Sequence, residues 1–312
     1  MSVLIPCFNR ARWVGETIES VAVQSMRDLE LIVIDDGSTD DSKNVIEASL
    51  ATLSFENAPQ FISRPNRGFV PTLIEGLERA TGKYFAYVDS DDVWLPEKLS
   101  RQVSALEESG EKVAACFSDC WVIDENGQRT DRLGRQYPYR GGDIYLDIVL
   151  SKFFPPAPTC VFDRERIVEV GGFNPDRLMG DRDLWMRFAR RFEVVYLTEP
   201  LAEYRVHGSN RSRDLVEGRF ESILESLEDA FARDPWLEEH RSRSVSGVRA
   251  RFAGAFYQSL DLRRARSEAI AALRSDWGNR TAWRVLFGSL LGRTLVNLLR
   301  RLRARVRASQ TG

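Results

Sequence analysis

The predicted fold is decided by one stretch, residues 31–40, which has the sequence LIVIDDGSTD. Four consecutive apolar residues, three of them β-branched, suit a strand that is buried on both faces, as in a parallel sheet. The polar residues that follow end this strand in a turn. Two other stretches have the same form: SVLIPCFNR at residues 2–10 and YFAYVDSDD at residues 84–92. Each stretch therefore predicts a buried strand with polar residues at its carboxyl end.

Amphipathic stretches lie between these strands and predict helices. Strand–helix–strand alternation is typical of an open α/β sheet with right-handed crossovers, so we expect a mainly parallel sheet flanked by helices. The pattern after residue 110 predicts strands at 113–118, 159–162 and 194–197, a loop at 129–142 and a helix at 181–191. From about residue 214 the pattern is helical without strands. We therefore expect a catalytic domain over 1–212 and a helical extension over 213–312.

Composition excludes several classes of protein. With 312 residues, 43% hydrophobic and 29% charged, the chain can bury a core and is neither disordered nor fibrous. A strand-like run begins at Val3, two residues after Met1, so we expect no leader peptide. The longest apolar stretch, 285–299, contains Arg293 and Asn297 and is shorter than the roughly 20 residues of a membrane span. The four cysteines are too sparse for a disulfide framework, so we expect buried free thiols and a cytosolic location.

The charge of the chain is unevenly distributed. The formal net charge is −2, which argues against a nucleic-acid partner. Eight arginines and no acidic residue follow Asp276, so this segment carries +8 and the first 276 residues carry the balance, −10. Residues 281–312 combine arginines with apolar residues, a pattern that suits either an anionic membrane surface or a docking helix with a solvated basic end. The first alternative predicts a peripheral position on the inner face of the membrane.

Ligands of an open α/β sheet bind outside the carboxyl ends of its strands. At the end of one predicted strand, Asp89 and Asp91 are two residues apart and can offer hard oxygens to one divalent cation. Such a cation neutralises a diphosphate leaving group. The alternative is that these acids only cap the next helix, a role that suits Asp92. The candidates at this edge are Pro6, Phe8, Asn9, Asp36, Asn66, Gly68, Asp89, Ser90 and Asp91.

The other candidates have a structural alternative as well. A turn around Asp36 needs no function, but its carboxylate can accept hydrogen bonds from a nucleobase or a ribose, and Phe8 can stack on a base. Asp181 and Asp183 at a helix start can complement the helix dipole, or one of them can act as a general base. His207 is one of only two histidines.

Taken in series, these motifs resemble a family 2 glycosyltransferase. The resemblance covers about residues 2–211 and is carried by the two opening motifs, by Asp89-Ser90-Asp91-Asp92, by the segment 181–185 and by the segment 204–208. It implies a GT-A fold and the transfer of a sugar from a nucleotide donor, linked to UDP, dTDP or GDP, with inversion at the anomeric carbon. These motifs do not encode the acceptor, which can be a lipid-linked saccharide, another saccharide such as a polysaccharide, or a small molecule. We expect a role in the synthesis of a cell-surface glycan or polysaccharide.

The resemblance also implies roles for individual residues. Asp181 matches the catalytic base, but Gly180 stands where the family often has an acid, which leaves Asp183 as an alternative base. The expected cofactor is a divalent cation, Mn²⁺ or Mg²⁺, held by Asp89, Asp91 and His207. The donor would be bound by Pro6, Phe8, Asn9, Asp36, Asn66, Gly68, Asp89 and Ser90, with Phe8 and Asp36 at the base.

Other classes fit less of the sequence. A haloacid-dehalogenase-like phosphatase accounts for Asp89-Ser90-Asp91-Asp92 but leaves the opening motif and Asp36 unexplained. A Rossmann dehydrogenase lacks its glycine-rich fingerprint after the first strand. A degenerate glycosyltransferase that binds a nucleotide without turnover is supported only by Gly180.

Overall fold

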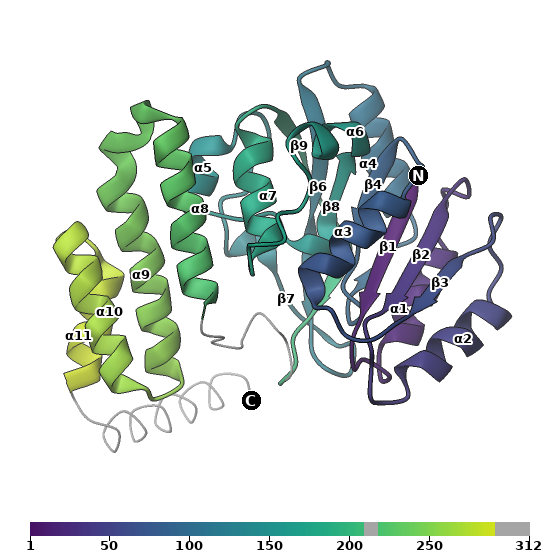
Figure 1. Cartoon of the computed structure of the whole chain (residues 1–312), viewed down its shortest axis with the longest axis horizontal. Coiled ribbons are helices and arrows are strands. Elements are labelled where there is room, and N and C mark those ends of the chain that lie inside the picture. The colour runs from purple at the N-terminus through teal and green to yellow at the C-terminus, as the bar shows by residue number, and fades with distance from the viewer. Residues whose placement is uncertain (209–217, 291–312) are drawn as a thin grey trace. The chain divides into compact units, whose positions relative to one another are not determined.

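The computed structural model describes residues 1–208 and 218–290. The chain divides into two compact units, one formed by residues 1–148 and 152–213 and the other by residues 149–151 and 214–312. Figure 1 traces the strands and helices along the chain.

One mixed sheet of nine strands forms the centre of the first unit, counted over its described residues. The strands β1, β2, β3 and β4 are parallel, as predicted, and β8 then reverses direction against β4. Strand β6 runs parallel to β9. In their order across the sheet the strands are β3 (Gln60–Ser63), β2 (Glu30–Asp35), β1 (Ser2–Cys7), β4 (Tyr84–Tyr87), β8 (Cys160–Asp163), β6 (Val113–Ile123), β9 (Glu193–Arg205) and β5 (Val93–Trp94), while β7 (Arg129–Arg132) pairs with β6 outside this order.

Helices cover the sheet, which confirms the predicted α/β architecture (Figure 1). Every residue of β1 is buried, as expected for a strand between two helical layers. The helices before residue 209 are α1 (Val14–Ala22), α2 (Ser42–Thr52), α3 (Phe69–Arg79), α4 (Lys98–Glu107), α5 (Tyr145–Val149), α6 (Arg164–Glu169) and α7 (Gly180–Ala189), with short 3-10 helices at Leu133–Arg135 and Ala157–Thr159.

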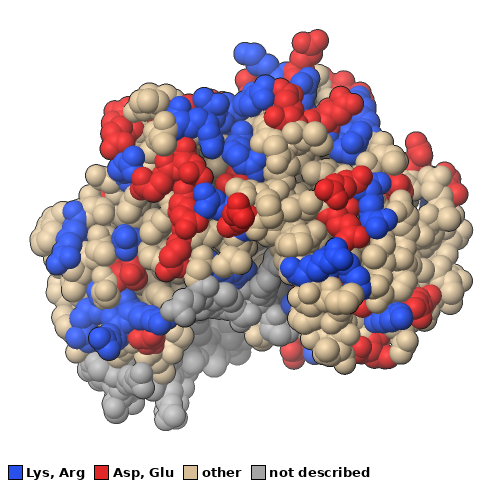
Figure 2. Space-filling view, viewed as in Figure 1, with Lys and Arg blue, Asp and Glu red and all other residues tan. Residues whose placement is uncertain are grey.

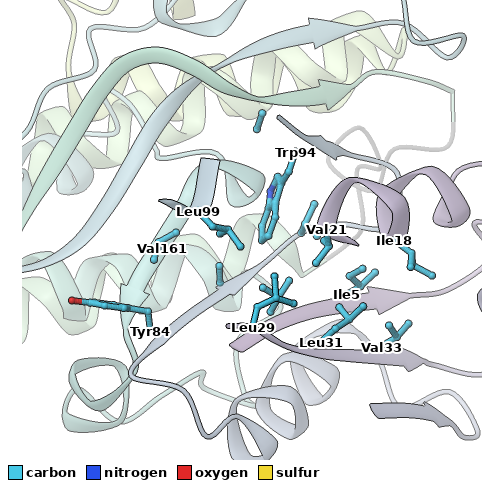
Figure 3. Packing of buried hydrophobic residues seen from close by; sticks show 14 of the residues in the cluster. Ile5, Ile18, Val21, Leu29, Leu31, Val33, Tyr84, Trp94, Leu99 and Val161 are labelled. Atoms are coloured by element: carbon cyan, nitrogen blue, oxygen red, sulfur yellow. The ribbon is translucent and has the colours of Figure 1, made fainter. Parts of the chain in front are cut away.

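Successive side chains of β1 point to opposite faces of the sheet, and different helices cover these two faces. Val3 and Ile5 point to a core that also contains Ile18 of α1 and Leu99 of α4, and Figure 3 shows this packing around Trp94. Leu4 points to the opposite face, where α3 lies so close that a Cβ on Gly76 would be 2.3 Å from the Leu4 side chain. Only glycine permits this approach, so α3 lies directly on the strand that leads to the candidate site.

Three predicted boundaries are wrong. Strand β6 continues from Ser118 to Ile123, and β9 extends to Arg205, because their backbone pairing continues through a bulge at the polar residue Asp119. Residues 129–142 are not all loop: β7 forms a hairpin with β6 although its sequence, RTDR, has no apolar residue. The four cysteines are free and buried, as predicted.

The second unit is helical in its described residues. Its helices are α8 (Arg219–Arg233), a 3-10 helix at Pro235–His240, α9 (Arg241–Gln258), α10 (Leu262–Ser275) and α11 (Arg280–Leu290). Among the described residues, no helix is long and apolar enough to cross a membrane. Six arginines of the predicted basic tail, at residues 293 and beyond, lie outside the described residues. Side chains of both charges are interspersed over the described part of the face in Figure 2.

Candidate active site

The parallel strands bring the sequence candidates to one edge of the sheet. Cys7 at the end of β1 lies in register with Asp35 at the end of β2. Strand β4 is parallel to β1, so the segment 89–92 leaves the sheet at the same edge. The predicted convergence of the first, second and fourth strand ends is therefore present.

Asp36 holds the loop at residues 64–68. Its carboxylate accepts hydrogen bonds from the backbone N–H groups of Arg67 and Gly68, both at 2.8 Å, and forms an ion pair with the Arg64 guanidinium. The side chain is buried. The next residue, Gly37, has a φ of +76°, and a Cβ there would lie 2.5 Å from the backbone nitrogen of Asn66. Asp36 and Gly37 thus fix the loop that carries two of the predicted donor-binding residues, Asn66 and Gly68.

The segment after β1 is fixed against the turn after β2. Asn9 adopts a φ of +53°, and its side-chain oxygen accepts a hydrogen bond from the Thr39 backbone N–H at 2.8 Å. Phe8 is 44% exposed, so one side of its ring is free of the core. Pro6 is buried within β1, and Ser90 is buried beside the Cys7 thiol. Phe8 and the exposed Asn66 are therefore the members of the predicted donor set that are most open to solvent.

Asp91 joins two segments that are distant in sequence. Its Oδ2 atom is 2.8 Å from Nε2 of His207 and 2.9 Å from Nε of Arg10. The imidazole of His207 is also stacked on the Trp13 indole, with ring centroids 4.1 Å apart. Asp91 is buried, so the guanidinium and the imidazole stabilise a carboxylate that has little access to water.

Asp92 does not cap a helix, contrary to the sequence-based alternative. Its Oδ1 atom accepts a hydrogen bond from the Arg205 backbone N–H at 2.8 Å, and α4 begins only at Lys98. The Arg205 side chain is buried and donates to the Asp91 carbonyl oxygen and to Glu16, both at 2.7 Å. Arg205 therefore fixes the segment 89–92 from the end of β9.

The next question is whether the residues expected to hold the divalent cation are suited to bind one. Among the described residues, no three His, Cys, Asp or Glu side chains are arranged as a metal site. Asp91 and His207 nevertheless bring a carboxylate oxygen and an imidazole nitrogen together, and the buried Asp92 Oδ2 has no hydrogen-bond partner among the described residues. Burial, and then the charges of Asp91 and Asp89, raise the pKa of Asp92 well above its usual range. Carboxylate oxygens and an imidazole nitrogen are groups that a divalent cation accepts as ligands, so the chemistry of these residues fits one.

The structure separates the two candidate bases at the start of α7. Asp183 is buried, and its carboxylate forms an ion pair with Arg187 at 2.6 Å. Asp181 is partly exposed, and its Oδ1 atom accepts a hydrogen bond from the Arg182 backbone N–H at 2.8 Å. Gly180 is packed against α3, since a Cβ there would lie 2.9 Å from the side chain of Val70. The close packing against Val70 thus explains why position 180 has a glycine and not an acidic residue.

Comparison with known proteins identifies the family. Residues 2–167, more than half of the chain, match the family described as Glycosyl transferase family 2. The chain therefore belongs to this family and is a glycosyltransferase. An uncharacterized glycosyltransferase of Nostoc sp. is 29% identical over 291 residues, which cover 91% of this chain and 86% of the relative. TuaG of Bacillus subtilis, a glycosyltransferase named for teichuronic acid biosynthesis, is 27% identical over 211 residues, covering 66% of this chain and 79% of the relative.

Solved structures with a similar fold are glycosyltransferases too. Residues 1–349 of Staphylococcus aureus TarS, in complex with UDP-GlcNAc, match with a TM-score of 0.59 and 16% identity over 92% of this chain and 89% of TarS. The mannosyltransferase PcManGT of Pyrobaculum calidifontis, in complex with GDP-Man and Mn²⁺, matches with a TM-score of 0.55 and 19% identity over 95% and 86%. At these identities the likeness shows the fold, which is GT-A. The phosphatase and dehydrogenase alternatives are therefore wrong.

Sequence reasoning missed three residues of the site. Arg10 contacts Asp91 over a separation of 81 residues, and Arg205 contacts it over 114 residues. No local sequence pattern indicates either contact. Trp13 precedes α1, which begins at Val14, and its indole stacks on His207, a contact 194 residues away in sequence that no local pattern indicates. The signal available for Arg205 was its position two residues before His207 in a conspicuous segment.

Proposed function

We propose that the chain transfers a sugar from a nucleoside diphosphate donor to an acceptor hydroxyl, with inversion at the anomeric carbon. The observation that carries the proposal is the polar edge of the sheet, where Asp91 contacts Arg10 and His207 and where Asp36 fixes the adjacent loop. Membership of family 2 supports it, and so do the nucleotide sugars in the TarS and PcManGT structures.

The nucleoside half of the donor is assigned to the ends of β1 and β2. The exposed Phe8 ring offers a face for stacking, and the loop held by Asp36 offers the exposed Asn66 as a polar contact. Because both oxygens of Asp36 already accept backbone hydrogen bonds, Asp36 acts on the base chiefly by fixing this loop. Asn9, Gly68 and the buried Pro6 support the same surface.

The diphosphate half is assigned to the segment 89–92. Asp89, Asp91 and His207 would hold a divalent cation, Mn²⁺ or Mg²⁺, with Ser90 beside them. When bound, the cation neutralises the negative charge of the diphosphate leaving group. Arg10 adds a guanidinium at the same carboxylate, 2.9 Å from Asp91, and so contributes positive charge on the side of β1. Trp13 and Arg205 position His207 and the segment 89–92 by stacking and hydrogen bonding.

Asp181 is assigned as the general base. Its carboxylate takes the proton of the acceptor hydroxyl, the oxygen attacks the anomeric carbon, and the bond between that carbon and the diphosphate oxygen breaks with its electron pair on the diphosphate. The attack comes from the side opposite the leaving group, so the configuration inverts. The ion pair of Asp183 with Arg187 supports this choice, since it keeps the carboxylate of Asp183 occupied.

The acceptor is assigned to a broad class. The likeness to TuaG supports a saccharide or lipid-linked saccharide acceptor in the synthesis of a cell-surface glycan or polysaccharide. The four free, buried cysteines support a reducing, cytosolic compartment.

A donor screen tests the proposal. Thermal unfolding is followed with UDP-, dTDP- and GDP-sugars, each with Mn²⁺, with Mg²⁺ and with a chelator, and the best donor is then assayed for hydrolysis. We expect one nucleotide to raise the Tm in the presence of a cation, and that donor to be hydrolysed slowly. Stabilisation without hydrolysis or transfer would support the degenerate, binding-only alternative. No stabilisation by any donor would contradict the proposal.

A further inference from the structure

Helix α11 of the second unit buries only one of its faces. Ala282 and Val285 are buried in clusters with residues of α9 and α10, and Ser289 is buried on the same side. These positions follow the helical spacing of three and four residues. The packing of this unit therefore accounts for one face of α11 and leaves the side chains on the other face unexplained.

An aromatic surface lies there, which we define as Trp277, just before α11, together with Trp283, Phe287 and Leu290 of α11. Of these, Trp283 is half-buried and also packs against the core cluster that contains Ala282. Trp277 is 72% exposed, and Phe287 and Leu290 are each about 60% exposed. Trp283 is stacked on Phe287 with ring centroids 5.4 Å apart, and it meets Trp277 edge to face at 4.6 Å. Trp277, Trp283 and Phe287 therefore form a continuous group, and Leu290 lies one helical turn beyond Phe287. Such a group is unusual for a surface exposed to water.

Two arginines lie on the same face of the helix. Arg280, Arg284 and Phe287 are spaced by four and three residues, so they lie one above another along α11. Both arginines are exposed, and neither forms an ion pair with a described residue. No acidic residue follows Asp276 in the sequence. The aromatic surface is thus bordered by positive charge that nothing in its own segment balances.

We propose that the aromatic surface, with Arg280 and Arg284, binds the interface of an anionic membrane. Tryptophan and phenylalanine side chains enter the headgroup region, and arginines contact lipid phosphates. In this arrangement α11 would lie in the plane of the interface, with its buried face still packed on α9 and α10. A second copy is the poorer occupant, because a twofold contact through this face brings like charges together.

The test is vesicle sedimentation of the full chain without any donor, so that its outcome is independent of the proposed transfer reaction. Vesicles of phosphatidylglycerol and phosphatidylcholine are compared with vesicles of phosphatidylcholine alone. We expect binding to the anionic vesicles, at least tenfold weaker binding of the double variant Phe287→Ser/Leu290→Ser, and about fivefold weaker binding for each of Arg280→Glu and Arg284→Glu. All four side chains are exposed, so the fold is expected to be retained.

A matched control exists in the same unit. Trp236 is 53% exposed, with the exposed Arg233 close by in sequence, but it is followed by Glu238 and Glu239. The variants Trp236→Ser and Arg233→Glu should bind vesicles as the wild type does. Equal binding to both kinds of vesicle, no binding, or unchanged binding by the Phe287 and Arg280 variants would overturn the proposal. A dimer in solution that the Phe287→Ser/Leu290→Ser variant abolishes would overturn it in favour of self-association.

Discussion

Nε2 of His207 lies 2.8 Å from Oδ2 of Asp91, although 116 residues separate them in the chain. The same oxygen is 2.9 Å from Nε of Arg10, so one carboxylate connects the ends of β1, β4 and β9. Trp13 holds the imidazole plane by stacking against it. This contact makes the segment 89–92 the centre of the proposed site, and it leads to a prediction for His207.

The variant His207→Ala should weaken cation-dependent nucleotide binding. The variant removes a nitrogen ligand of the proposed cation and leaves Arg10 as the partner of Asp91 at this oxygen. We therefore expect the nucleotide affinity in the presence of the cation to fall by about 10- to 100-fold. The measurement is calorimetric titration of the best nucleoside diphosphate with Mn²⁺ present and with a chelator. The other histidine, His240, lies in the helical unit, and His240→Ala is the control. Equal Mn²⁺-dependent affinity in both variants would remove His207 from the cation site.

The variant Asp36→Ala should loosen the loop at residues 64–68 as well as weaken nucleotide binding. The backbone N–H groups of Arg67 and Gly68 lose their acceptor, so their hydrogen exchange should accelerate at least tenfold. Nucleotide affinity should fall by about the same factor. The exposed Asp41 supplies the control, Asp41→Ala, for which both values should stay as in the wild type. Faster exchange with unchanged affinity would separate this loop from the donor site.

The variant Gly180→Ala should destabilise the fold through Val70. The new methyl group would lie 2.9 Å from the Val70 side chain, and such overpacking lowers the free energy of unfolding by about 1–3 kcal/mol. Combining it with Val70→Ala makes room for the methyl group, so in that background the loss should fall to near zero. Urea unfolding of the four proteins gives the coupling energy. Additive effects would show that the two residues do not touch.

Lys98 makes stability depend on pH. The side chain is fully buried over the Trp94 ring, and its Nζ has no hydrogen-bond partner among the described residues. Burial lowers the pKa of Lys98 from 10.5 to about 7. Between these values the unfolded chain binds the proton and the folded chain does not, so stability rises with pH, by about 1.4 kcal/mol per unit from this group alone. Below pH 7 both states are protonated, and the full penalty for burying the charge applies.

The variant Lys98→Met removes this dependence. It should be more stable than the wild type at pH 6, and the difference should shrink as the pH rises from 7 to 10. Urea unfolding at four pH values measures this difference, with the exposed Lys112→Met as the control that shows no such trend. A constant difference between Lys98→Met and the wild type would mean that Lys98 stays protonated in the fold up to its ordinary pKa.

The strands that carry the site were predictable because their signal is local. Continuous apolar runs predicted β1, β2 and β4, and the polar residues after them marked the edge where ligands bind. Strand β7 was not predictable, because its residues, RTDR, have no apolar side chain, and its contacts to β6 are backbone pairing and polar or charged side chains such as Arg132, which pairs with Asp119. The continuation of β6 beyond Ser118 was not predicted either, because the polar Asp119 interrupts its apolar run.

The partners of the predicted acids could not be read from the sequence. Asp91 and Asp36 stood out as acids after strands, but Arg10 reaches Asp91 only because β1 and β4 are neighbours in the sheet. Asp183 differs from Asp181 because it forms an ion pair with Arg187, one helical turn away. The sequence could not show this, since the spacing permits a contact without requiring it.

The role of Asp181 as the base of the glycosyl transfer is tested by single-turnover transfer with the variant Asp181→Asn. The amide keeps the shape of the side chain but cannot take the acceptor proton, so transfer should fall by about 10²–10⁴-fold while nucleotide affinity is unchanged. Asp183→Asn loses its ion pair with Arg187 and should lower stability while leaving transfer within about tenfold of the wild type. Transfer retained by Asp181→Asn and lost by a folded Asp183→Asn would contradict the account.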